Sequence, residues 1–132
     1  MRVTLDSNVL IAAFATRGLC QAVLELCIEK HAVVLGEGIL REVEDCFLNK
    51  LKIPGKMSDA LMRFIEGKAE ILNTGESLGI ECEDPDDVHA LSLVVKGDVE
   101  CLVTGGKALL KMGKIGNTRI LSPRGFWEIQ QA

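Results

Sequence analysis

Short apolar runs alternate with amphipathic segments along almost the whole of this 132-residue chain. The apolar runs predict strands at residues 2–6, 32–35, 70–72, 101–104 and 118–121. The segments with helical spacing predict helices at residues 8–15, 19–30, 38–51, 57–69, 85–96, 107–112 and 123–129. Leu51 and Phe64 are expected on the inward faces of their helices, and residues 75–82 are expected to form a loop. Strands that alternate with helices pair in parallel through right-handed crossovers. We therefore expect an α/β fold, namely a three-layer α/β/α sandwich around a central, mainly parallel sheet.

Length and composition narrow the class of protein. A chain of 132 residues is expected to form a single domain over residues 1–132. Its hydrophobic content of 48% is enough for a packed core. No run approaches about 20 consecutive apolar residues, so no membrane span is predicted. The net charge of −4 argues against a surface that grips nucleic acid on all sides, although a local basic rim is compatible with it.

Cysteine and histidine usage points to the cytoplasm and away from zinc. The five cysteines are an odd number and form no C-x-x-C pair, which is typical of free thiols in a cytoplasmic protein. The two histidines, His31 and His89, lie far apart and match no zinc-ligand spacing.

An aspartate stands at the carboxyl end of the first predicted strand. In open α/β sheets, ligands bind outside the carboxyl ends of the strands, and Asp6 is placed there. Its other interpretation is an N-cap for the following helix, with Ser7 as a rival cap. One carboxylate can serve both purposes, because a negative charge also suits the helix dipole.

A second acidic cluster opens the predicted helix that starts at residue 85. Capping alone accounts for it, with Asp84 as N-cap and the next acids complementing the helix dipole. Yet acids this close repel one another unless water or a cation neutralises them. At the third helical position, Asp87 would share a face with Leu91 and point toward the rim of the sheet. Together with Asp6, this cluster suggests a metal site.

Glu42 is a third candidate, on the predicted helix 38–51. It lies beside the apolar positions Ile39 and Val43, but also close to Glu44 and Asp45. It is therefore either a site residue or one of several solvated acids, and the pattern does not choose between the two.

The ordered set of motifs resembles the PIN-domain nucleases. The resemblance covers nearly the whole chain, and its motifs are Asp6-Ser7-Asn8-Val9-Leu10, Glu42 on its helix, Asp84-Pro85-Asp86-Asp87, and Leu102-Val103-Thr104-Gly105. The close of the chain, Leu121-Ser122-Pro123 followed by Phe126, is similar to that of one bacterial and archaeal branch.

This resemblance implies a Mg²⁺- or Mn²⁺-dependent ribonuclease that hydrolyses RNA phosphodiesters, often the toxin of a toxin–antitoxin pair. It assigns the catalytic, metal-binding roles to Asp6, Glu42 and Asp87, with Asn8 and Thr104 in support. The partners it implies are an RNA substrate, an antitoxin protein and a second copy of the chain, in the cytoplasm and with no membrane.

One departure from the family pattern favours an alternative. The branch usually has an aspartate directly after Thr-Gly and often another acid two positions later, where this chain has Gly106 and Ala108. Glycine offers no side-chain ligand, although Asp84 could compensate. The alternative function is therefore a catalytically weakened or inactive PIN-like module for RNA binding or regulation. The RNA-binding residues stay open, because Lys107, Lys111, Lys114 and Arg119 fit either RNA contact or a solvated face.

Overall fold

A central sheet organises the chain in a computed structural model that describes residues 1–73 and 87–131. Within these residues the sheet has six strands in the order β3-β2-β1-β4-β6-β5. The strands are β1 (Arg2–Leu5), β2 (Ala32–Gly36), β3 (Ala69–Leu72), β4 (Cys101–Val103), β5 (Lys114–Ile115) and β6 (Thr118–Leu121). Every pairing is parallel except that of β5 with β6. The predicted mainly parallel sheet is confirmed.

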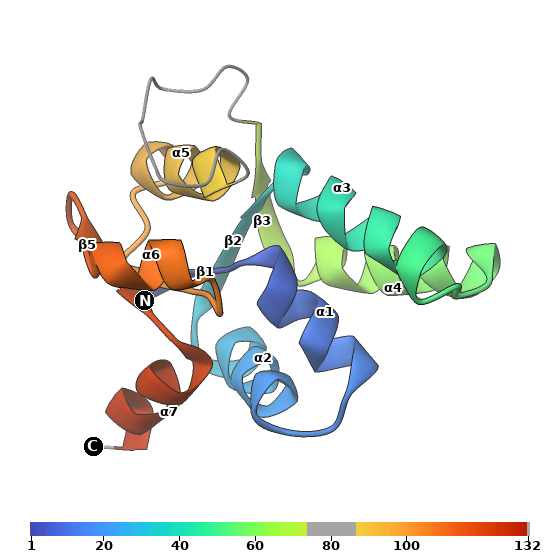
Figure 1. Cartoon of the computed structure of the whole chain (residues 1–132), viewed down its shortest axis with the longest axis horizontal. Coiled ribbons are helices and arrows are strands. Elements are labelled where there is room, and N and C mark those ends of the chain that lie inside the picture. The colour runs from blue at the N-terminus through green and yellow to red at the C-terminus, as the bar shows by residue number, and fades with distance from the viewer. Residues whose placement is uncertain (74–86, 132) are drawn as a thin grey trace.

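Helices cover both faces of this sheet. They are α1 (Ser7–Ala15), α2 (Leu19–Lys30), α3 (Glu37–Asp45), the π-helix η1 (Cys46–Lys50), α4 (Gly55–Gly67), α5 (Val88–Lys96), α6 (Lys107–Met112) and α7 (Pro123–Gln131). In Figure 1 the strands run through the middle, with α5 and α6 on one side and α1 to α4 on the other. The three-layer α/β/α architecture is therefore confirmed. In the described ranges no single helix is long and apolar enough to cross a membrane. Helices α1 and α2 together have the necessary length and apolar composition, but they form a pair bent by 109°.

The middle strands are buried on both faces. Leu5 of β1 and Leu102 of β4 have no solvent exposure, and neither do their strand neighbours Val3 and Val103. Parallel strands covered by helices on both sides are near-continuous apolar runs for this reason. A polar side chain at the end of such a strand is therefore placed at the rim rather than in the core.

The strand order reverses between β1 and β4. From β1 the chain builds β2 and β3 on one side, and later it places β4 and β6 on the other. Leu5 is level with Val103, and the Asp6 N–H donates to the Val103 carbonyl at 2.9 Å. Asp6 and Thr104 consequently follow neighbouring strands at one edge, as predicted. This reversal point is where open α/β sheets bind their ligands.

The predicted helix 38–51 changes from an α-helix to a π-helix after Asp45. It is an α-helix only to Asp45, and a π turn then follows in which the Leu51 N–H donates to the Cys46 carbonyl at 2.9 Å. A π turn takes up one residue more than an α turn, so the apolar stripe is displaced. Phe47 is fully buried, whereas Leu51, predicted to face inward, is 42% exposed.

Two further expectations are wrong in detail. Phe64 was expected on the buried face of α4, but it is 46% exposed and Met62 is buried in its place. The two-residue strand β5 was not predicted, because Lys114 and Ile115 are too few to give a periodic pattern. β5 turns back onto β6 through Gly116, whose φ of +54° suits a glycine.

The start of α5 also differs from the prediction. Val88 is its first residue, which places Asp87 in the N-cap position rather than at the third helical position. The expected loop 75–82 and the proposed cap Asp84 lie outside the described residues.

Two buried cysteines lead to a labelling prediction. Burial raises the pKa of Cys27 to about 12 and that of Cys101 to about 11, and neither side chain is more than 2% exposed. We expect iodoacetamide at about pH 8 to leave both unmodified in the native protein, because the thiolate is the nucleophile. The partly exposed Cys46 should react. Peptide mass spectrometry before and after unfolding checks this, and rapid native labelling of Cys27 would contradict the packing.

Candidate active site

Asp6 joins β1 to α1 and caps the helix. Its backbone is extended, with φ −66° and ψ 160°, and its Oδ1 accepts the Ser7 N–H at 2.8 Å. Its carbonyl accepts the N–H groups of Val9 and Leu10 at 3.0 and 3.1 Å. Asp6 is therefore the N-cap, and Ser7 is the first residue of the helix. The capping interpretation leaves the other carboxylate oxygen for a second purpose.

That second oxygen is held by neutral donors. Asp6 Oδ2 accepts the Thr104 hydroxyl at 2.8 Å and the Asn8 side-chain amide at 3.3 Å. Asp6 is only 7% exposed and Thr104 is fully buried. Hydrogen bonds from a hydroxyl and an amide fix the direction of the carboxylate without cancelling its charge. The result is a nearly buried negative charge at the reversal point of the sheet.

Asn8 ties this corner to the loop after β4. Its Oδ1 accepts the Gly105 N–H at 3.0 Å, and its amide lies 3.5 Å from the Thr104 hydroxyl oxygen. The same hydroxyl oxygen accepts the Gly106 N–H at 3.0 Å. Asn8 and Thr104 therefore lie beside Asp6 and hold it, which is the arrangement expected of supporting residues.

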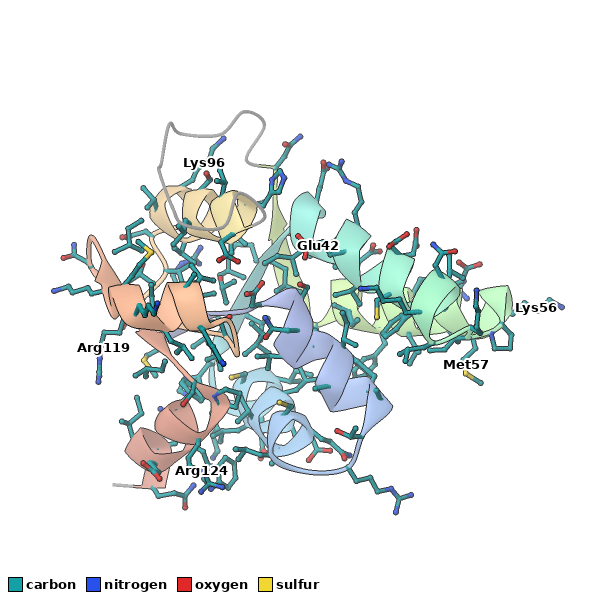
Figure 2. The ribbon with its side chains drawn as sticks, viewed as in Figure 1. Glu42, Lys56, Met57, Lys96, Arg119 and Arg124 are labelled. Atoms are coloured by element: carbon teal, nitrogen blue, oxygen red, sulfur yellow. The ribbon has the colours of Figure 1, made fainter. Side chains whose placement is uncertain are left out.

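Ser7 links Asp6 to Glu42. The Ser7 hydroxyl donates to Glu42 Oε2 at 2.7 Å, while its backbone N–H donates to Asp6. Ser7 is 8% exposed, whereas Glu42 lies at the surface of α3 beside the start of α1 (Figure 2). Sequence reasoning considered Ser7 only as a cap. Its adjacency to Asp6 was the available signal, but its partner depends on how α3 packs against α1.

The third predicted acid stays a prediction. Asp87 lies at the beginning of α5, and Asp84 lies outside the described residues. Within 1–73 and 87–131, no three Asp, Glu, His or Cys side chains form a group that could hold a metal ion. What the structure brings together is the pair Asp6 and Glu42, with hydroxyl and amide groups around it.

This pair nevertheless has the donor chemistry of a hard-cation site. Mg²⁺ takes oxygen ligands and is often bound through only one or two protein carboxylates, with waters completing its shell. In the described part of the chain, neither Asp6 nor Glu42 takes part in an ion pair. Two nearby carboxylates without a cationic partner repel each other. The residues present therefore fit a divalent cation, and an additional carboxylate would strengthen that fit.

Glu42 also forms a wall shared by two hollows. One, of about 280 Å³, is lined by Ser7, Asn8, Ile11, Glu42, Asp45, Cys46 and Lys50. The other, of about 390 Å³, is lined by Gly38, Arg41, Glu42 and His89. α3 and α5 approach closely at Gly38, where a Cβ would lie 3.1 Å from His89 Cγ and would require the His89 side chain to shift by a few tenths of an ångström. Of the three basic side chains in these hollows, the sequence analysis considered His89 only as a zinc ligand and gave no role to Arg41 or Lys50.

Two of the basic residues suggested for RNA contact lie away from this edge. In the register of the sheet, Arg119 of β6 lies level with Cys101 of β4, and Lys114 of β5 lies level with Arg119. The carboxyl ends of β4 and β6 are instead at Val103 and Leu121. Both basic residues thus lie toward the opposite end of the strands. Lys107 begins α6 directly after Gly106, so its suggested contact stays a prediction.

A comparison with known families assigns the chain. A profile of the PIN domain family matches residues 2–108, which include Asp6, Glu42, Asp87 and Thr104. The chain belongs to the PIN-domain family. The resemblance of the motifs is thereby confirmed. Gly106 and Ala108 also lie inside the matched region, so the expected loss of acids at these positions falls within the domain and stays a prediction.

A solved structure shares the fold of this PIN domain. The crystal structure of VapBC2 from Rickettsia felis, bound to a DNA fragment from their promoter, contains a chain that matches with a TM-score of 0.68. The match covers 92% of this chain and 98% of that one, at 14% sequence identity. No curated protein sequence matches the chain.

Proposed function

We propose that this PIN-domain protein is a metal-dependent ribonuclease that hydrolyses RNA phosphodiesters, with Mg²⁺ or Mn²⁺ as cofactor. One observation carries the proposal. The Asp6 carboxylate lies at the reversal point of the sheet, where the donors that hold it among the described residues are all neutral, and it is linked through Ser7 to Glu42. An acidic pair that forms no ion pair within residues 1–73 and 87–131, at the edge where such sheets bind ligands, suits a cation and an anionic substrate.

Each residue has a proposed role. Asp6, Glu42 and Asp87 would hold the cation, which when bound supplies a polarised phosphoryl oxygen and a water of lowered pKa. Asn8 and Thr104 orient Asp6 through their donors. Asp84 remains a candidate supporting acid outside the described residues. The whole chain, residues 1–132, is proposed to act as one domain.

The proposed partners are an RNA substrate, an antitoxin protein and a second copy of the chain. The fold match to a chain of the VapBC2 complex supports the antitoxin partner, through fold alone. The proposed location is the cytoplasm, where RNA is found and where the free cysteines of the described residues would stay reduced.

The alternative proposal is a catalytically weakened or inactive PIN domain that serves in RNA binding or regulation. The observation that favours it is Gly106, which offers a backbone N–H to Thr104 but no carboxylate to a cation. Cleavage of single-stranded RNA in Mn²⁺, in Mg²⁺ and with a chelator separates the two functions. The ribonuclease requires cleavage that the chelator abolishes. The module requires RNA binding without cleavage, and a protein that does neither contradicts both.

Gly106→Asp is expected to tighten Mn²⁺ binding and to raise cleavage, each by roughly tenfold, the lower end of effects typical for groups around a metal. There is room for the change. A Cβ at Gly106 would have its nearest neighbour, Thr104 Oγ1, at 3.4 Å, and the φ of −72° suits any L-residue. Calorimetric titration with Mn²⁺ and initial cleavage rates measure the two effects.

Gly18→Asp is the matched control for this variant. Gly18 is also a helix N-cap without a side-chain bond, and nothing lies within 4 Å of a Cβ there. It adds the same carboxylate to a helix start away from the site. Equal metal affinity in wild type and Gly106→Asp would show that the missing acid is not what limits this site.

A further inference from the structure

The π turn changes which side chain of the α3–η1 helix faces the acidic pair. In a continuous α-helix of 3.6 residues per turn, residue 50 would lie about 80° around the axis from Glu42, and Asn49 would be its nearer neighbour. Here Lys50 lines the hollow together with Glu42, Asp45 and Cys46, while Asn49 does not. Asn49 instead donates to Asp45 Oδ1 at 2.7 Å. The extra residue of the turn thus moves a lysine onto the face of Glu42.

This placement is built into the packing. Phe47, inside the π turn, is fully buried, and its ring meets Phe14 of α1 edge to face at a centroid distance of 6.1 Å. The Ile53 N–H donates to the Phe47 carbonyl at 2.8 Å just beyond the turn. The backbone of Lys50 is therefore anchored on both sides, although its side chain is exposed.

The surroundings of Lys50 suit an anion from outside the chain. The hollow is lined by two carboxylates, Glu42 and Asp45, yet in the described ranges Lys50 forms an ion pair with neither. Among the described residues that line this hollow, Lys50 has the only cationic side chain. The remaining walls, from Ser7, Asn8 and Ile11, carry no charge. An ammonium group here can attract a phosphate toward the otherwise acidic edge.

We propose that Lys50 binds a backbone phosphate flanking the scissile one, so that a single strand of RNA reaches Asp6 and Glu42 through the hollow lined by Asn8 and Lys50. This inference rests on the proposed ribonuclease function and adds a direction of approach to it. Lys50 is a substrate-positioning residue, so it affects the affinity for RNA more than the turnover of bound RNA.

Binding of a labelled single-stranded RNA tests the inference in a chelator, where cleavage is prevented. One phosphate contact on a single strand contributes about 0.7 to the slope of log K against log salt, or about fivefold between 1 M and 0.1 M salt. Lys50→Ala should lower the slope by that amount and weaken binding about fivefold at 0.1 M, whereas Lys50→Arg should bind like wild type. With Mn²⁺ present, KM should rise in Lys50→Ala while kcat is kept.

Two further variants test whether RNA binding depends on the position of Lys50 or only on the number of positive charges. Lys56→Ala removes an exposed lysine in the first turn of α4, well away from Glu42 (Figure 2). This variant should leave the RNA affinity and the salt slope unchanged. The double variant Asn49→Lys/Lys50→Asn keeps composition and net charge but moves the lysine off the face of Glu42, so it should bind as weakly as Lys50→Ala. Circular dichroism and thermal unfolding establish that each variant is folded.

The outcomes distinguish this inference from the proposed function. If wild type cleaves RNA and Lys50→Ala behaves like Lys56→Ala, only the inference is overturned. The same holds if the double variant binds like wild type, or if Lys50→Ala loses stability with an unchanged salt slope, since Lys50 would then only offset neighbouring acids. A wild-type protein that neither binds nor cleaves RNA overturns both.

Discussion

Asp6→Asn is expected to lower metal-dependent RNA cleavage at least about a hundredfold, the scale seen when one group that stabilises transition-state charge is removed. The variant should still fold, because asparagine is as good an N-cap as aspartate and its carbonyl can accept the Ser7 N–H. The side chain would lose its charge, however, and its amide would face the donors of Asn8 and Thr104. Cleavage rates in Mn²⁺, with thermal unfolding as the folding check, measure the effect.

Asp59→Asn is the matched control, since Asp59 is an exposed residue of α4 and the chemical change is the same. It should cleave like wild type. If Asp6→Asn also cleaved like wild type, the activity would belong to a contaminating nuclease, and the assignment of Asp6 would lose its support.

Phe47→Ala is expected to lower the free energy of unfolding by about 3–5 kcal/mol, as is usual when a buried phenylalanine is removed. Phe47 is fully buried and packs edge to face against Phe14. Phe64→Ala is the comparison, because Phe64 makes a similar contact with Phe14, at 6.2 Å and 85°, but is 46% exposed. That variant should lose only about 1–2 kcal/mol. Equal losses in urea denaturation would mean that the π turn is not anchored through Phe47.

The sequence predicts which residues lie at the strand ends because hydrophobic periodicity and position along the strand are local properties. Alternation identifies β1 and β4, and parallel pairing then requires Asp6 and Thr104 to share an edge. The contact of Ser7 with Glu42 is not local, since it depends on the rotation of α3 against α1. The residue pattern of α1 or of α3 alone does not determine the angle between the two helices.

The π turn was missed for a related reason. Residues 38–51 have an apolar spacing that a continuous α-helix explains, and the extra residue becomes apparent only when Phe47 is buried and Leu51 is not. Phe64 shows the same limit, because α4 could bury either Phe64 or Met62 and tertiary packing selects Met62. The gathering of Asp87 with Asp6 and Glu42 remains a prediction.

The bond between Asp6 and Thr104 has a consequence for the chain while it is being made. The two residues are 98 positions apart, and the Thr104 N–H is itself bonded to the Leu121 carbonyl of β6. During synthesis, Asp6 emerges from the ribosome long before β4 or β6 has been made. A nascent chain that ends ahead of β4 therefore has Ser7 and Asn8 beside the first acid but lacks the Thr104 hydroxyl that also holds it. Under the proposed function, a partly synthesised chain on the ribosome is therefore expected not to cleave the RNA around it.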